Sequence, residues 1–220
     1  MPTSTVEDYL KCIHREEHAG QGRLVSTGKI AQEMSVAPGT VTAMMKTLTE
    51  TGLIDYEPYM GVRLTDRGRT LAAHVLRRHR LVELFLVRIM EMDWSEVHAE
   101  AEILEHAVSD GLIDRMDKML GHPKVDPHGD PIPSSAGTLA ESDDPSLLVC
   151  ALNRDLEITR VTDQRTEFLR LLEQHQLMPG RRAIVEHRDE LTETVQVRPN
   201  GGEPLRLGFQ AASRILVEGE

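Results

Sequence analysis

The stretch from residue 26 to residue 69 most constrains how this chain of 220 residues can fold. Two short helices are expected there, one around residues 26–34 and a second that begins at Pro38, because proline is preferred in the first turn of a helix. Gly52 follows the last turn of the second helix, as expected for a helix end. Residues 53–68 then alternate between apolar and polar side chains about a glycine turn, which predicts a two-stranded hairpin. This order of elements is typical of a winged helix-turn-helix.

The second of these helices has the side-chain pattern of a helix that lies in the major groove of DNA. Its apolar positions Val41, Met45 and Leu48 are predicted to face the core. The other positions are small or polar, as suits contact with base edges, and basic residues on either side could meet phosphates. A helix-turn-helix used only for packing or protein contact is the alternative, but the basic flanks and the hairpin favour DNA. The predicted DNA-binding residues are Ala37, Pro38, Gly39, Thr40, Thr42, Ala43, Lys46 and Arg63.

Charge is distributed unevenly along the chain, whose net charge is −11. Residues 1–90 hold 12 Lys and Arg against 10 Asp and Glu, a net of +2, and residues 91–220 hold 13 against 26, a net of −13. This segregation permits a DNA-binding head on an acidic body. Cys12 and Cys150 lie far apart and form no CxxC pair, which suits a reducing compartment. Because the sequence has neither an 18-residue apolar run nor a signal-peptide pattern, we expect a cytoplasmic protein.

Two longer helices are expected after the hairpin, one over about residues 70–92 and the other over 95–120. Their apolar faces exceed what one small domain needs to bury. A helix-turn-helix usually reads paired half-sites as a symmetric dimer, so we expect a homodimer held through these helices. The apolar faces comprise Leu81, Leu84, Phe85, Ile89, Ile103, Leu104, Val108 and Ile113.

The C-terminal third changes character. Residues 121–146 are rich in Pro, Gly, Ser and Asp, as in a linker or an extended wrapping segment. Four short β-rich runs follow, the first over residues 146–152, together with one helix over 165–176, and a small β-barrel fits this pattern. The predicted fold class is mainly α, with a winged helix-turn-helix domain over 1–74, a helical domain for dimerisation and metal binding over 75–140, and a small SH3-like β-barrel over 147–220.

Histidine and acidic residues gather on one stripe of the predicted helix over residues 95–120. His98, Glu102, Glu105 and His106 stand at i, i+4, i+7 and i+8, where a packed helix would usually carry leucines. A solvated face with ion pairs is the alternative. It fits poorly, because the two glutamates have no Lys or Arg at i±4 and would repel one another. Oxygen and nitrogen donors at these spacings can instead converge on one cation.

Two other helices offer further ligands of the same kind. His79 and Glu83 stand at i and i+4 on the preceding helix. Asp8 lies on the first helix, which we expect to begin at Ser4 because Ser4 and Glu7 have capping-box spacing. The sequence therefore predicts a metal site of carboxylates and imidazoles beside a DNA-binding head.

An enzyme is the alternative of a different class. A di-iron carboxylate bundle needs paired Glu-x-x-His motifs on four helices, and Glu83, Glu102 and Glu105 begin no such motif. A His-Glu-x-x-His zinc motif, a phosphate-binding loop and a GxSxG motif are also absent from the sequence. We therefore expect no catalysis. The remaining histidines are most simply surface or core residues: His14, His18, His74, His122, His128, His175 and His187.

These features together resemble the diphtheria toxin repressor family of metal-dependent transcriptional regulators, over nearly the whole chain. Residues 30–54 (IAQEMSVAPGTVTAMMKTLTETGLI) resemble its helix-turn-helix, and residues 59–72 (YMGVRLTDRGRTLA) resemble its wing. The spacing from His79 to His106 is that of its metal-bearing dimerisation helices. The end of the chain looks like its SH3-like C-terminal domain, of the ferrous-transport-A type.

The resemblance implies two metal sites per subunit. One site comprises His79, Glu83 and His98, often joined by side chains of the third domain, which align here as Gln164 and Glu167. The other site comprises Asp8, Glu102, Glu105 and His106.

The resemblance also implies which metal is bound. Iron-responsive relatives carry Met and Cys at the positions of Asp8 and Glu102, whereas manganese-responsive relatives carry Asp and Glu. Hard carboxylates suit Mn²⁺. The chain thus resembles the manganese-responsive three-domain branch, which implies a repressor that binds palindromic operator DNA as a metal-activated dimer and controls manganese uptake; an Fe(II)-responsive repressor of iron-uptake genes is the alternative. Two-domain manganese regulators add a Glu where this chain has Lys11, so two separated sites are expected rather than a binuclear cluster.

Overall fold

The computed structural model describes residues 3–20, 22–140 and 143–219. The chain forms two compact units. The first comprises the described residues up to His79 together with Glu105–Val108 and Pro133–Leu139, and the second comprises Arg80–Leu104, Ser109–Ile132 and the described residues from Ala140 onward. The division into three domains stays a prediction. Within the described residues, no helix is both long enough and apolar enough to span a membrane.

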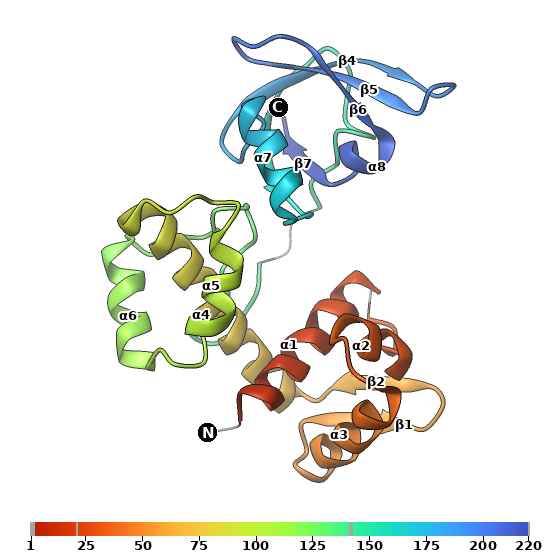
Figure 1. Ribbon diagram of the computed structural model, residues 1–220, viewed down its shortest axis with the longest axis vertical. Coiled ribbons are helices and arrows are strands. Elements are labelled where there is room, and N and C mark those ends of the chain that lie inside the picture. The colour runs from red at the N-terminus through yellow and green to blue at the C-terminus, as the bar shows by residue number, and fades with distance from the viewer. Residues whose placement is uncertain (1–2, 21, 141–142, 220) are drawn as a thin grey trace. The chain divides into compact units, whose positions relative to one another are not determined.

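The first unit contains a winged helix-turn-helix, as predicted (Figure 1). Helices α2 and α3 pack against one another, α3 contacts strand β1, and α1 contacts strand β2. The two strands pair antiparallel, with Ile54 opposite Leu64. The elements are α1 (Ser4–Ala19), α2 (Thr27–Glu33), α3 (Pro38–Glu50), β1 (Ile54–Glu57) and β2 (Gly61–Leu64), followed by the start of α4 (Asp66–Met90).

Helix α1 has a side-chain cap at its first turn, and the capping residue is Thr3. Thr3 is the N-cap, and its side-chain hydroxyl accepts a hydrogen bond from the backbone N–H of Val6 at 3.4 Å. The predicted start of this helix at Ser4 is confirmed, but the capping role implied by the spacing of Ser4 and Glu7 belongs to Thr3. An N-cap hydroxyl satisfies one of the amides that have no partner in the first helical turn.

The core of the first unit confirms the predicted facing of α3. Val41, Met45 and Leu48 are fully buried, and they pack with Leu10 and Ile13 of α1. Their spacing of four and three residues places them on one face of the helix, which leaves the opposite face open.

The second unit combines helices with a five-stranded antiparallel sheet whose strand order is β6-β5-β4-β3-β7 (Figure 1). Alternate residues of these strands, such as Leu156, Ile158, Val195 and Val197, are buried in one core. The elements after α4 are α5 (Val97–Leu104), α6 (Asp110–Met119), β3 (Asp155–Val161), α7 (Thr166–Gln174), β4 (Arg182–Asp189), β5 (Thr194–Pro199), β6 (Leu205–Gly208), α8 (Phe209–Ala212) and β7 (Ile215–Glu218).

The single helix predicted over residues 95–120 is two helices, α5 and α6. Helix α5 ends at Leu104, and Ser109 has the extended backbone of an N-cap (φ −74°, ψ 153°) before α6 begins. Serine and aspartate favour helix starts over helix interiors, although the Ser109 side chain makes no capping hydrogen bond here. Glu105 and His106 therefore lie in a turn rather than on the predicted helical stripe.

The strand predicted over residues 146–152 is instead a turn. Only Ser146 makes an isolated bridge, to Leu216, and the backbone N–H of Cys150 donates to the Ser146 carbonyl. The guanidinium of Arg188 donates to the Leu147 and Cys150 carbonyls, which are then unavailable to a neighbouring strand. Strands β3 and β6 were missed.

Candidate metal centre

The first candidate centre, in the first unit, joins α1 to the turn after α5. Asp8 lies on α1, and Glu105 and His106 lie in the turn. Nε2 of His106 lies 2.9 Å from Oδ1 of Asp8 and 3.4 Å from Oε1 of Glu105. Each of the three residues offers a ligand atom, and these atoms lie within 4.8 Å of one another. Two carboxylate oxygens and one imidazole nitrogen form a donor set that suits a divalent cation.

The ring of His106 is oriented by two residues that were not predicted to be part of the metal site. Nδ1 of His106 donates to Oε2 of Glu7 at 2.8 Å, and the Arg78 guanidinium donates to the other Glu7 oxygen at 2.6 Å. Glu7 is buried, although it neighbours the half-buried Asp8 on α1. A carboxylate on the second ring nitrogen is the usual support for a histidine that ligates a metal. Glu7 therefore directs Nε2 toward Asp8.

Glu105 is completely buried, and two further nitrogens lie close to its carboxylate besides that of His106. The ammonium of Lys11, on α1, lies 2.6 Å from Oε1, and Nδ1 of His79, on α4, lies 2.6 Å from Oε2. A buried carboxylate needs such partners because removing its charge from water is costly. The turn that carries Glu105 is thus tied to both helices.

Protons compete with cations in this cluster. Burial raises the pKa of Asp8, although the charges of His106 and Lys11 oppose the shift. Burial of the His106 ring lowers its pKa, but the hydrogen bond to Glu7 and the charges of Asp8 and Glu105 outweigh burial, so the pKa of His106 is raised above its ordinary value. A divalent cation therefore has to displace protons from this cluster.

A second cluster lies in the second unit and involves Glu83 of α4 with two residues of the segment predicted as a linker. Glu83, Asp126 and His128 are all buried and offer ligand atoms within 4.8 Å of one another. Nδ1 of His128 lies 3.9 Å from Glu83 Oε2 and 4.0 Å from Asp126 Oδ1. Of the two predicted alternatives, a linker or an extended wrapping segment, burial of Asp126 and His128 favours the second.

The tautomer of His128 decides what this second cluster can bind. Nε2 donates to the backbone carbonyl of Trp94 at 3.0 Å, so the lone pair is on Nδ1. Nδ1 is buried and has no hydrogen-bond partner in the part of the chain that the structure describes. It faces the two carboxylates, which also offer lone pairs. An unpartnered buried nitrogen that faces two carboxylates is a donor set that a divalent cation can bind.

Burial shifts the pKa values of both ionisable residues from the segment after α6 in this second cluster. Burial raises the pKa of Asp126 well above its ordinary value, helped by the charges of Asp130 and Glu83. Burial also lowers the pKa of His128, which keeps its ring neutral. A neutral imidazole is the form that ligates metals.

The other predicted ligands of the helical segment lie near these clusters. Nδ1 of His98 lies 3.1 Å from Oε1 of Glu83, and its Nε2 lies 3.6 Å from Oε1 of Glu102 on the same helix, α5. His79 precedes Glu83 by one turn of α4. Both are buried.

Gln164 and Glu167, the two predicted ligands from the C-terminal part, differ in their surroundings. The amide of Gln164 donates through Nε2 to Oδ2 of Asp130 at 2.8 Å, and Arg160 forms an ion pair with the same aspartate. Glu167 is exposed in the first turn of α7, and it belongs to none of the groups of possible metal ligands among the described residues. Gln164 is thus placed to hold the segment that carries Asp126 and His128.

Asp126 and His128 are candidate ligands that the sequence interpretation missed. His128 was assigned to the surface or core, and the segment around it was predicted to be a linker or an extended wrapping segment. The signal was "DPH", a carboxylate and an imidazole two residues apart in a proline-rich stretch. Oδ1 of Asp126 accepts from the backbone N–H groups of His128 and Asp130, which fixes the turn.

The predicted DNA-contact residues lie on the open face of α3 and on the hairpin. Thr40, Ala43 and Lys46 are exposed, as are Ala37, Pro38 and Gly39 at the start of the helix, and Thr42 is half-buried. Arg63 is exposed on β2, and the buried carboxylate of Glu17 fixes that strand by accepting from the Leu64 N–H at 2.7 Å. The structure therefore presents these residues to solvent on a supported hairpin.

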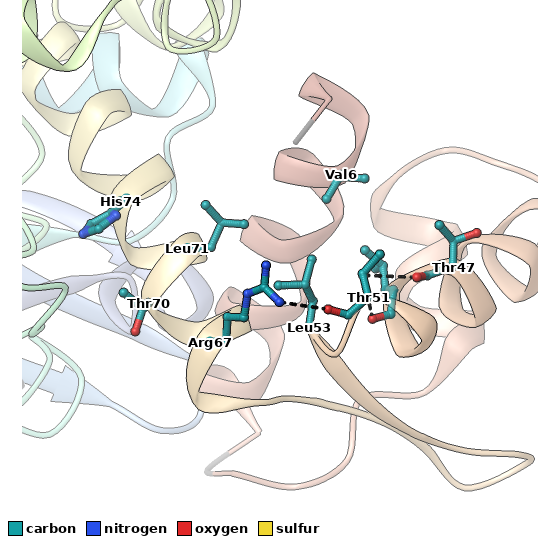
Figure 2. Close-up of a pocket in the computed structure, with 9 residues that line it drawn as sticks. Val6, Thr47, Thr51, Leu53, Arg67, Thr70, Leu71 and His74 are labelled. Atoms are coloured by element: carbon teal, nitrogen blue, oxygen red, sulfur yellow. Dashed lines mark hydrogen bonds between the residues drawn. The ribbon is translucent and has the colours of Figure 1, made fainter. Parts of the chain in front are cut away.

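A cavity of about 670 Å³ lies in the same unit between α3, α4 and Val6 of α1 (Figure 2). Leu48, Leu53 and Leu71 contribute apolar surface to it, and the Arg67 guanidinium donates to the Thr51 carbonyl at 3.3 Å. None of its lining residues belongs to either carboxylate cluster.

Known protein families match most of the chain. The N-terminal DNA-binding domain of iron-dependent repressors matches residues 1–62, and their metal-binding and dimerisation domain matches residues 65–134. The FeoA domain matches residues 147–219.

Individual relatives agree with these matches. A solved manganese-dependent transcriptional repressor in complex with manganese is 36% identical, covers 98% of this chain and 100% of its own, and superposes with a TM-score of 0.86. The structure of the manganese regulator SloR is 33% identical, covers both chains completely and has a TM-score of 0.76. The iron-dependent repressor IdeR of Mycobacterium tuberculosis is 36% identical over 129 residues, which are 59% of this chain. That match spans 55% of the length of the curated relative.

Proposed function

The chain belongs to the diphtheria toxin repressor family of metal-dependent regulators, and from this premise we propose that it is a Mn(II)-dependent transcriptional repressor. It binds palindromic operator DNA as a dimer and controls genes for manganese uptake. The observation that carries the proposal is the cluster of Asp8, Glu105 and His106, which joins the first helix of the DNA-binding head to the turn after α5. In this proposal the protein acts in the cytoplasm and catalyses no reaction.

The choice of Mn(II) rests on the donor atoms. Asp8 offers a hard carboxylate oxygen where a thioether would favour a softer ion. The two solved relatives described above are named for manganese, although the IdeR relative is named for iron. An Fe(II)-responsive repressor of iron-uptake genes is the second candidate.

Two sites are proposed in each subunit. The first uses Asp8, Glu105 and His106, with Glu102 as the fourth predicted ligand. The second is built around Glu83, with His79 and His98 from the helices and with Asp126 and His128 from the segment after α6. Gln164 supports this second site through Asp130 rather than as a direct ligand, and Glu167 has no place in it.

A bound divalent cation supplies positive charge that neutralises the carboxylates and fixes their positions. Asp8 and Glu7 of α1 then hold His106 of the turn from both sides of its ring. Because α1 packs on the hairpin and on α2, this tie restrains the whole DNA-binding head. The cation activates only to the extent that it prefers the DNA-competent arrangement.

The dimer is proposed from the apolar residues that the second unit leaves exposed. Ile103 on α5 is 68% exposed, Met119 on α6 is 64% exposed and Met90 at the end of α4 is 58% exposed. A contiguous patch of such side chains would mark an interface, and we propose that these three contribute to one. Paired heads would then present two α3 helices to the half-sites of an operator.

The test is fluorescence anisotropy with DNA from the gene's own upstream region. Metal-free protein is compared with protein given Mn²⁺, Fe²⁺, Co²⁺ or Zn²⁺ under anaerobic conditions. The proposal expects binding to appear at a lower concentration of Mn²⁺ than of Fe²⁺. An equal or stronger response to Fe²⁺ would favour the second candidate.

A further inference from the structure

The ammonium of Lys11 forms an ion pair with a carboxylate of the first cluster. It lies 2.6 Å from Oε1 of Glu105, the same oxygen that lies 3.4 Å from Nε2 of His106. The Lys11 side chain is only 14% exposed and the Glu105 side chain is fully buried, so water screens this pair weakly. Lys11 stands one helical turn after Asp8 on α1, since helical residues three apart are neighbours.

This position conflicts with a cation held by Asp8, Glu105 and His106. A small divalent ion lies about 2.1 Å from its carboxylate oxygens. An ammonium at hydrogen-bond distance from the same oxygen would then be within about 4 to 5 Å of a doubly charged ion, in surroundings where charges repel strongly. The ion therefore has to move the ammonium away from Glu105 or bind against its repulsion.

We propose that the Lys11 ammonium competes with the metal ion for Glu105. Lys11 thereby lowers the affinity of the first site for the metal and sets the metal concentration at which the protein responds. In the metal-free protein Lys11 compensates the buried charge of Glu105. On metal binding the ammonium gives up Glu105. The inference rests on the proposed function, because it takes this cluster to be the metal site.

The test is a titration of the full-length protein with Mn²⁺, followed by the loss of the electron paramagnetic resonance signal of free Mn²⁺. The variants are Lys11→Gln, which removes the charge, and Lys11→Arg, which retains it. Arg15→Gln is the matched control, since Arg15 lies one turn further along α1, is 61% exposed and pairs with Glu33. It changes the net charge by the same amount away from the cluster.

The expected result is that Lys11→Gln binds Mn²⁺ at least about tenfold more tightly than the wild type at this site, about 1.4 kcal/mol. Lys11→Arg and Arg15→Gln should stay within about threefold of the wild type. A second readout is thermal unfolding. Metal-free Lys11→Gln should melt at a lower temperature, because Glu105 loses a partner, and it should gain more from added Mn²⁺.

Unchanged or weaker Mn²⁺ binding by Lys11→Gln would overturn the inference. An equal rise in Mn²⁺ affinity in Lys11→Arg would overturn it too. If the metal-free variant unfolds, the affinities are compared by withdrawing Mn²⁺ from loaded protein with a chelator of known affinity. His106→Ala separates the two claims. Loss of wild-type binding in that variant supports the metal site whatever Lys11 does, whereas a wild type that binds no Mn²⁺ overturns the proposed function and the inference with it.

Discussion

Oδ1 of Asp8 lies 2.9 Å from Nε2 of His106, although 98 positions separate the two residues in the sequence. One residue lies on the first helix of the DNA-binding head and the other lies in the turn that follows α5. A metal ion that binds both residues therefore restrains the position of the DNA-binding head. Metal binding and DNA binding can be linked through this pair.

The nature of the side chain at position 8 should decide which metal is preferred. Replacing Asp8 by Met exchanges a hard oxygen donor for a soft thioether. We expect Asp8→Met to lose at least about tenfold in Mn²⁺ affinity and to shift its preference toward Fe²⁺. Competition between the two metals under anaerobic conditions measures the shift.

Asp163→Met serves as the control for that comparison, because it makes the same exchange at a carboxylate paired with Arg165. It should leave the preference at the first site unchanged. An Asp8→Met protein that still favours Mn²⁺ to the same degree would show that the hardness of this donor does not set selectivity.

The affinity for Mn²⁺ should fall at low pH. The pKa of His106 is raised in the metal-free protein, so its protonated form stabilises the fold below the ordinary pKa, and this contribution is lost as the pH rises through the raised pKa. Metal binding has the opposite dependence because it removes that proton. We expect the affinity to fall by up to about tenfold per pH unit below the raised pKa of His106.

Titrations with Mn²⁺ between about pH 5.5 and about pH 8.5 measure this dependence. Glu7→Gln weakens the hydrogen bond that raises the pKa of His106. In that variant the fall should begin at a lower pH. A Glu7→Gln protein with an unshifted profile would contradict the assignment of the proton to His106.

Arg63 of the hairpin should contribute to DNA affinity through phosphate. Removing one phosphate contact weakens binding to all sequences and reduces the slope of log affinity against log salt by about one. We expect this result for Arg63→Ala in anisotropy titrations at several salt concentrations. Arg206→Ala, at an exposed position of β6, should change neither the affinity nor the slope. Equal losses of DNA affinity in both variants would show that the hairpin does not contact DNA.

Ile103 should lie in the dimer interface. Its side chain is 68% exposed on α5, and a glutamate there would place a charge in an apolar contact. Ile103→Glu should sediment as a monomer under conditions in which the wild type is a dimer. Leu191→Glu, at a side chain that is 94% exposed beyond β4, is the matched control and should stay dimeric. A dimeric Ile103→Glu protein would exclude α5 from the interface.

The DNA-binding head was predictable from the sequence because its signals are local. Pro38 and Gly52 mark the ends of one helix, and the spacing of Val41, Met45 and Leu48 identifies its buried face. The turn at Glu105 and His106 was not predicted, since it depends on an N-cap at Ser109 inside a stretch whose residues otherwise favour helix. The structure brings Asp8, Glu105 and His106 together, although the stripe that suggested the last two does not exist as one helical face.

The second cluster was predicted only in part, for a different physical reason. Glu83 is on a regular helix, where spacing identifies its neighbours. Asp126 and His128 are buried by tertiary contacts, such as the bond from His128 to the Trp94 carbonyl, which no local pattern encodes. The same holds for Lys11, whose role depends on Glu105, 94 positions away.

The most direct test of the account is the Mn²⁺ dependence of DNA binding by the wild type, His106→Ala and His187→Ala. His187 is exposed on β4 and serves as the histidine control. Anisotropy of the upstream DNA should rise with Mn²⁺ for the wild type and for His187→Ala, and His106→Ala should need at least about 100-fold more metal. Tight DNA binding by the metal-free wild type, or an unchanged Mn²⁺ dependence in His106→Ala, would contradict the claim that this cluster controls DNA binding.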